Sequence, residues 1–298
     1  MRKIILMLLC SLSAHAYAQL PQVSNGSIQR LKAFPSKYVQ SRNVDIYLPE
    51  NYSPEKQYSV LYMHDGQMLF DATNTWNKQE WMVDEHVSKL IDQGIISDCI
   101  VVGVWNAGAY RHTDYFPEKA LKYLPEELQK SEEQKLMGNP LGDEYLLFLT
   151  RELKPFIDKE YATYTDAAHT FIMGSSMGAL ISIYAICEYP DIFGAAACMS
   201  THWVGDTEVK NDLIPKAFNS YLESNLPDPK HHRIYFDYGT ETLDSLYPPY
   251  QEMIDKTMQA KGFIAKNWVS KVFVGAAHTE NSWNKRLDIP LTFLLKKE

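Results

Sequence analysis

The chain has 298 residues and a formal net charge of −8 with its histidines neutral. The first 18 residues carry +2, so the remaining 280 carry −10, which disfavours nucleic acid as a partner. This length suffices for one large domain with a full core, and no linker or repeat divides it.

The N-terminus has the pattern of a secretory signal peptide. Arg2 and Lys3 precede an apolar run over 4–12, and Ala-Tyr-Ala at 16–18 stands before Gln19. The apolar run is far shorter than the roughly 20 residues of a membrane-spanning helix. We therefore expect cleavage near Ala18, a single domain over 19–298 without a membrane anchor, and a location in the periplasm or outside the cell.

Beyond the leader, short β-rich apolar runs alternate with longer helical patterns, which predicts a mostly parallel sheet with helices on both faces. We predict strands at 44–48, 59–63, 99–105, 169–173, 195–199, 233–238 and 269–274. We predict helices at 81–93, 145–161, 177–188, 248–261 and 282–297. Cys99, Cys187 and Cys198 lie in apolar segments, which favours buried free thiols over disulfides.

Two segments interrupt this alternation. Residues 106–142 are long and charged, with several aromatic residues and a predicted helix over 125–136, and 201–230 forms a second excursion. Both follow predicted strands, where insertions usually overhang the site of an α/β protein. They are either lid-like walls of a cleft or solvated surface loops.

Gly-Ser-Ser-Met-Gly at 174–178 fits the G-x-S-x-G pattern and makes Ser176 the candidate nucleophile. The glycines permit a sharp turn from strand to helix, and the helix directs its first amides at a developing oxyanion. A predicted strand precedes this turn and an apolar helix follows it, as the nucleophile elbow of the α/β-hydrolase fold requires.

In that fold the acid and then the base follow the nucleophile along the chain. Of the nine histidines, only His278 follows both Ser176 and the strand that should deliver the acid. The alternative for His278 is an ordinary loop histidine. For the acid we prefer Asp244, which precedes the loop into the next helix; Glu241 is the alternative, and Asp237 lies inside the strand.

The oxyanion hole should combine the amide of Met177 with one from the loop after the strand 59–63. That second amide belongs to Gln67, with Gly66 as the alternative, while His64 should brace the loop by hydrogen bonding. His231 and His232 are adjacent and have no further ligand at metal spacing, so we expect no metal. No Gly-rich phosphate loop is present in the sequence, so we expect no cofactor.

At these residues the sequence resembles the putative-esterase family, which contains feruloyl and acetyl-xylan esterases, S-formylglutathione hydrolase, enterochelin-type siderophore esterases and mycolyltransferases. The similarity spans nearly all of the chain after the leader. It rests on Val-Leu-Tyr-Met-His-Asp-Gly-Gln at 60–67 with Leu-Phe-Asp at 69–71, Glu-Leu-Lys-Pro-Phe-Ile-Asp at 152–158, the serine motif, and Gly-Ala-Ala-His at 275–278. Ala179 stands where many members have a second glycine, and 239–244 departs from the compact Gly-x-x-Asp form of the acid loop.

The resemblance implies ester hydrolysis through an acyl-enzyme. Aromatic residues at predicted strand ends suggest a small-molecule or saccharide ester as substrate, because their faces could stack a sugar or an aromatic acyl group; the alternative is packing of a lid. The candidate substrate-binding residues are Trp105, Arg111, Tyr115, Trp203 and Trp283. Arg111 could instead pair with Asp114. Acyl transfer on the same triad, siderophore-ester hydrolysis and a binding protein on a hydrolase scaffold are the alternative functions.

Overall fold

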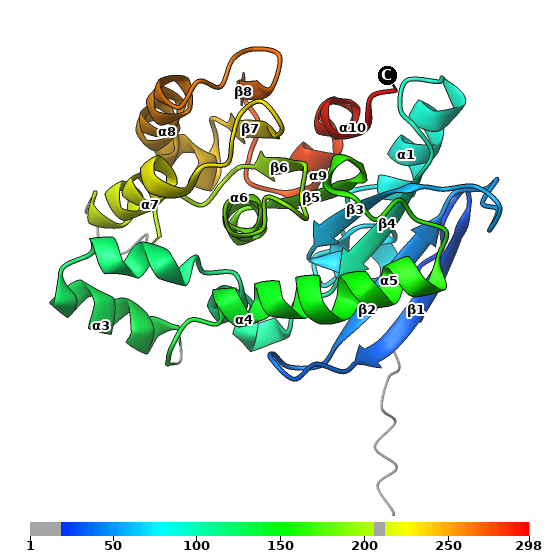
Figure 1. Cartoon of the computed structure of the whole chain (residues 1–298), viewed down its shortest axis with the longest axis horizontal. Helices are drawn as coiled ribbons and strands as arrows, with labels where there is room; N and C mark the ends of the chain where they lie inside the picture. Colours follow the sequence, from blue (N-terminus) through cyan, green and yellow to red (C-terminus); the bar gives the residue numbers. More distant parts are fainter. Residues whose placement is uncertain (1–18, 137, 206–211, 298) are drawn as a thin grey trace, which may run out of the picture.

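A computed structural model of the protein describes residues 19–136, 138–205 and 212–297 and has one eight-stranded sheet at its centre (Figure 1). The strands are β1 (Ser27–Phe34), β2 (Arg42–Leu48), β3 (Ser59–His64), β4 (Cys99–Val104), β5 (Thr170–Ser175), β6 (Ala195–Met199), β7 (Arg233–Gly239) and β8 (Trp268–Phe273). The predicted signal peptide lies outside the described residues, and the single domain over 19–298 stays a prediction.

The strand order is β1-β2-β4-β3-β5-β6-β7-β8. β1 and β2 run antiparallel to their neighbours, and the strands from β4 to β8 pair in parallel. The predicted mostly parallel sheet is therefore confirmed. Because parallel strands end at one edge, the residues after β3, β5, β6, β7 and β8 meet there.

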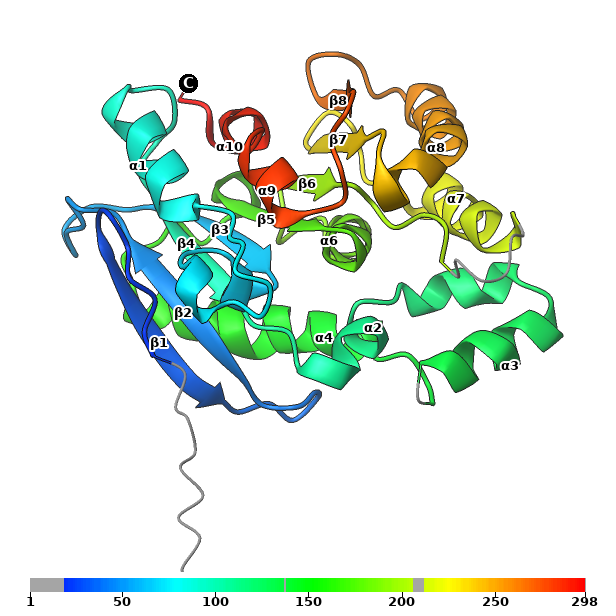
Figure 2. The same ribbon diagram turned by 180° about the vertical axis from the view of Figure 1, so that it is seen from behind.

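Helices cover both faces of the sheet, as Figures 1 and 2 show. They are α1 (Val83–Asp92), α2 (Arg111–Asp114), α3 (Glu126–Lys135), α4 (Gly142–Leu147), α5 (Lys154–Glu160), α6 (Met177–Glu188), α7 (Leu213–Asn225), α8 (Pro248–Ala260), α9 (Glu280–Asn284) and α10 (Asp288–Leu295). The core on one face includes residues of α4 to α8, and the core on the other includes residues of α1 and α10. Cys99, Cys187 and Cys198 are buried free thiols, as predicted.

The fold differs from the prediction at β1, at α7, which was not predicted, and at the helices predicted over 145–161 and 282–297. β1 was not predicted because it is an edge strand without a fully buried residue, so it has no apolar run. The predicted helix 145–161 has a π-helical turn at Phe148–Leu153, just before Pro155, which cannot donate a backbone hydrogen bond to the preceding turn. The predicted helix 282–297 is broken into α9 and α10, and Pro290 lies in the first turn of α10.

The described residues of the segment 106–142 pack against the rest of the domain rather than forming a solvated loop. The ion pair of Arg42 and Asp114, 2.9 Å long and buried, ties it to β2, and Tyr115 is fully buried. Phe116, the next residue, packs on α7, where its ring centre lies 5.7 Å from that of Phe218. The described parts of the segments 106–142 and 201–230 therefore pack against each other beside the carboxyl edge of the sheet (Figure 1).

Candidate active site

Ser176 lies at the sharp turn between β5 and α6, with a φ of 57° and a ψ of −122°. A non-glycine residue in this region is strained and persists only where its surroundings hold it. Here the Ser176 amide donates a hydrogen bond to the Met199 carbonyl on β6, 3.0 Å away. The turn also needs its first glycine, because a Cβ on Gly174 would lie 2.7 Å from the backbone of Gly178. The first glycine of the G-x-S-x-G pattern is therefore required by the close approach of the backbone in this turn.

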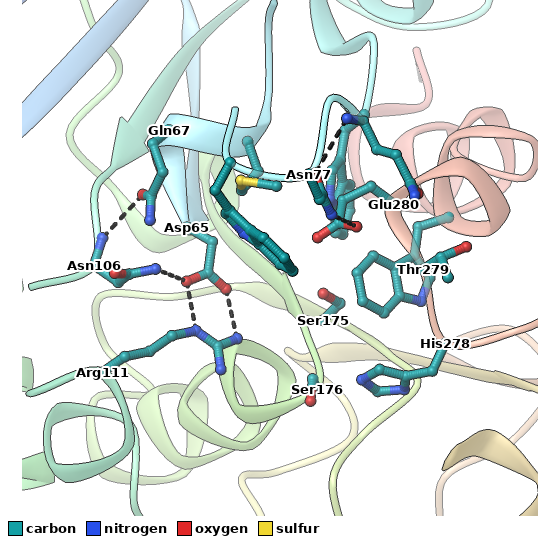
Figure 3. A pocket seen from close by; sticks show the side chains of 15 residues that line it. Asp65, Gln67, Asn77, Asn106, Arg111, Ser175, Ser176, His278, Thr279 and Glu280 are labelled. Atoms are coloured by element: carbon teal, nitrogen blue, oxygen red, sulfur yellow. Dashed lines mark hydrogen bonds and ion pairs between the residues drawn. The ribbon is translucent and has the colours of Figure 1, made fainter. Parts of the chain in front are cut away.

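His278 follows β8 and is held against Asp244. Its Nδ1 lies 2.6 Å from Oδ1 of Asp244, and its backbone amide donates to the hydroxyl of Thr242 over 2.8 Å. Figure 3 shows the imidazole directed toward Ser176, with no hydrogen bond drawn between the two side chains. Of the two candidate acids, Asp244 makes this contact, whereas Glu241 is exposed.

The carboxylate of Asp244 is fully buried. Its second oxygen, Oδ2, accepts hydrogen bonds from the Ser200 hydroxyl and the Gly239 amide, each 2.6 Å long. Burial on its own raises the pKa of Asp244, but the hydrogen bonds from His278 and Ser200 outweigh it and hold the pKa below its ordinary value. An ionised Asp244 requires Nδ1 of His278 to carry the proton, so a neutral imidazole presents an unprotonated Nε2.

Ser176 and His278 both line a cavity of about 450 Å³. On its other side, Arg111 forms a two-pronged ion pair with Asp65, with both nitrogen–oxygen distances 2.7 Å (Figure 3). Asn106 also donates to Asp65, over 2.7 Å. Burial raises the pKa of Asp65, but the Arg111 guanidinium and Asn106 more than compensate and hold it below its ordinary value. The cavity thus contains a fixed cation whose charge is largely balanced.

The two amides expected at the oxyanion hole each lie in the first turn of a helical segment. Met177 is the first residue of α6, and Gln67 is the middle residue of a 3₁₀ turn at Gly66–Met68. Amides in a first helical turn lack acceptors within their helix, so they are available to an anion. Gln67 lines the cavity, and its side-chain oxygen accepts from the amide of Asn106. Gly66 cannot easily be replaced, because a Cβ there would lie 2.4 Å from the backbone of Gly103.

The expectation that Trp105, Tyr115 and Trp203 face the substrate is wrong. Tyr115 and Trp203 are buried in the core, with 0% and 1% exposure. The indole of Trp105 donates to Asp45 and lies under Arg30, and it is not among the described residues that line the cavity. Residue type and position at or beyond predicted strand ends marked these rings as candidates, whereas packing against neighbours fixes where they point.

Two other candidates do line the cavity, namely Arg111 and Trp283. The alternative that Arg111 pairs with Asp114 is wrong, because Asp114 pairs with Arg42 and Arg111 with Asp65. Trp283 packs edge-on against His278, with ring centres 5.0 Å apart. Trp76, an aromatic residue at the cavity rim, is 83% exposed.

His64 is buried beside the site and hydrogen-bonds through Nδ1 to the hydroxyl of Tyr145, 2.9 Å away. Burial lowers its pKa to about 3, so it stays neutral. This contact joins the end of β3 to α4, as the bracing role requires. Within the described parts of the chain, no group of three or more His, Cys, Asp or Glu side chains could hold a metal ion.

Three polar residues behind Asp244 were not predicted to have a role there. They are Ser200, Arg286 and Asp237, which the sequence suggested only as a less favoured acid. They form a buried chain in which Arg286 Nη2 lies 3.0 Å from Ser200 Oγ and 2.9 Å from Asp237 Oδ1. Only the position of Ser200, directly after β6 at the carboxyl edge, could have drawn attention to it.

Comparison with known proteins gives one family and several relatives. The Esterase family, described as "Putative esterase", matches residues 36–293. Uncharacterized protein YjcH of Bacillus subtilis (strain 168) is 27% identical over 221 residues, 74% of this chain and 75% of that protein. An endo-1,4-beta-xylanase/feruloyl esterase of Xylanibacter ruminicola is 24% identical over 280 residues, 91% of this chain and 32% of that protein.

Among solved structures, a ferulic acid esterase superposes with a TM-score of 0.65 at 18% identity, over 92% of this chain and 99% of that one. At this identity the similarity shows the fold, which is the α/β-hydrolase fold predicted from the sequence.

Proposed function

The chain belongs to the Esterase family and is a carboxylic-ester hydrolase, and from this premise we propose that Ser176, His278 and Asp244 form its catalytic triad. The observation that carries the proposal is the 2.6 Å contact between His278 and the buried Asp244, beside a serine on a strained strand-to-helix turn. Burying a carboxylate costs free energy, so a fully buried carboxylate is not expected as the partner of a loop histidine without a catalytic role.

In the proposed mechanism, Nε2 of His278 takes the proton of Ser176 as its oxygen attacks the ester carbonyl. The amides of Met177 and Gln67 stabilise the oxyanion, and the alcohol leaves with the proton from His278. Water then attacks the acyl-enzyme by the same route and releases the acid. The hydrogen bond between Ser176 and His278 forms with substrate in place, since such contacts are often long in unliganded enzymes.

Replacing Ser176 with alanine should lower kcat for p-nitrophenyl acetate by at least roughly a thousandfold while the fold is retained. Hydrolysis rates and circular dichroism measure the two properties. A fluorophosphonate probe should label the wild-type protein at Ser176, as read by peptide mass spectrometry. Labelling at Ser175 instead, or full activity in Ser176→Ala, would contradict the proposed nucleophile.

We further propose that the substrate is an ester of a carbohydrate or of an aromatic acid. One sequence relative is named an endo-1,4-beta-xylanase/feruloyl esterase, and Trp76 offers an open aromatic face at the cavity rim. Arg111 lines the same cavity. Its guanidinium has five N–H donors, of which Asp65 accepts one from Nε and one from Nη2. A flat apolar face beside a few polar donors suits a sugar or a phenolic ring.

A panel of feruloylated saccharides, acetylated xylan and siderophore-type esters tests this proposal. We expect the highest kcat/KM on one of the first two classes, and Trp76→Ala should raise its KM by about fivefold, because an aromatic contact is worth roughly 1 kcal/mol. Tyr38→Ala, which removes an exposed ring that does not line the cavity, should leave KM unchanged. Preference for the siderophore-type ester, or equal effects of the two variants, would refute the substrate class.

The leader residues 1–18 lead us to propose that the enzyme acts outside the cytoplasm. Among the described residues, none of the helices has the length and hydrophobicity of a membrane-spanning segment. Expressed in a bacterium with a Sec export pathway, the protein should be found in the periplasm or medium, and its N-terminal sequence should begin at or near Gln19. Recovery from the cytoplasm with residues 1–18 intact would contradict the location.

A further inference from the structure

Ser200 is a fully buried residue directly after β6, next to the proposed catalytic acid. Its backbone is strained, with a φ of 45°. Its amide donates to the Asp237 carbonyl on β7, over 2.7 Å, which holds the strained residue in place. Strain at a fully buried position that contacts a proposed catalytic residue suggests a role in the site.

The hydroxyl of Ser200 contacts three polar side chains. Its oxygen lies 2.9 Å from the indole nitrogen of Trp283, 3.0 Å from Nη2 of Arg286 and 2.6 Å from Oδ2 of Asp244. A hydroxyl has one proton and two lone pairs, whereas indole and guanidinium nitrogens only donate. Trp283 and Arg286 therefore fill both lone pairs. The Ser200 proton can only go to Asp244, so the direction of this hydrogen bond is fixed.

Arg286 is itself held in position. It is 4% exposed, and its Nη2 bridges Ser200 and the fully buried Asp237. Asp237 also accepts from the hydroxyl of Tyr235 on its own strand, 2.9 Å away. The positive charge is thus balanced by Asp237 and is not in direct contact with Asp244. What Arg286 provides to Asp244 is the orientation of Ser200.

We propose that Ser200 is a positioning residue, which Arg286 and Trp283 lock as a hydrogen-bond donor to Asp244 so that the other carboxylate oxygen stays directed at His278. Without that donor, Oδ2 keeps only the Gly239 amide, and the carboxylate is held less firmly against rotation away from the imidazole. This inference rests on the proposed catalytic role of Asp244.

A double-mutant cycle tests the inference. Ser200→Ala should lower kcat by roughly 10- to 100-fold, the effect typical of losing a hydrogen bond to a buried charge, with KM changed by less than about twofold. In the Asp244→Asn background, the same substitution should change kcat by less than about twofold, because its target is already lost. The matched control is Ser182→Ala, which removes another fully buried hydroxyl, bonded to the Gly178 carbonyl. It should leave kcat within about twofold of wild type.

Thermal unfolding of every variant reports whether it folds. If Ser200→Ala does not fold, Ser200→Cys enters the same cycle, since a thiol is of similar size but a weak donor. Unchanged kcat in the Ser200 variant, or an equal loss in both backgrounds, would overturn the inference and leave the triad intact. Full activity of Asp244→Asn would instead refute the proposed triad, and this inference would fall with it.

Discussion

The arrangement of the site depends on one buried charge, the carboxylate of Asp244. Removing an ion from water is costly unless hydrogen bonds replace its hydration. Here the replacements come from three places in the fold: Ser200 after β6, Gly239 at the end of β7 and His278 after β8. The need to satisfy this carboxylate therefore brings together three loops that the parallel sheet places at one edge, and with them the imidazole beside Ser176.

The same edge carries backbone strain on neighbouring strands. Asp65, Ser176 and Ser200 follow β3, β5 and β6, and each has a positive φ although none is glycine. Each is held by contacts that other elements supply, such as Arg111 on Asp65 and the Met199 carbonyl on the Ser176 amide. A rigid, well-packed sheet can hold such conformations, which direct side chains and amides into the cavity rather than along the strands.

Much of the fold and the candidate catalytic residues could be predicted from the sequence, because local patterns encode them. Alternating apolar runs gave seven of the eight strands, and the elbow motif with chain order gave Ser176 and His278 as candidates. The acid was harder to predict, because only the three-dimensional structure shows that Asp244, and not Glu241, contacts His278. Ring orientation was not predictable, as the burial of Tyr115 and Trp203 shows. Nor was the contact of Arg286 with Ser200, which joins residues 86 positions apart.

The claim on which the account depends is that Asp244 fixes the tautomer of His278. Nuclear magnetic resonance of protein labelled with ¹⁵N-histidine measures this directly, with the His278 signals assigned by difference from His278→Gln. The neutral imidazole should carry its proton on Nδ1 and leave Nε2 bare, and Asp244→Ala should abolish this preference. A neutral His278 protonated on Nε2 in the wild-type enzyme would contradict the account, because that nitrogen could not accept the proton of Ser176.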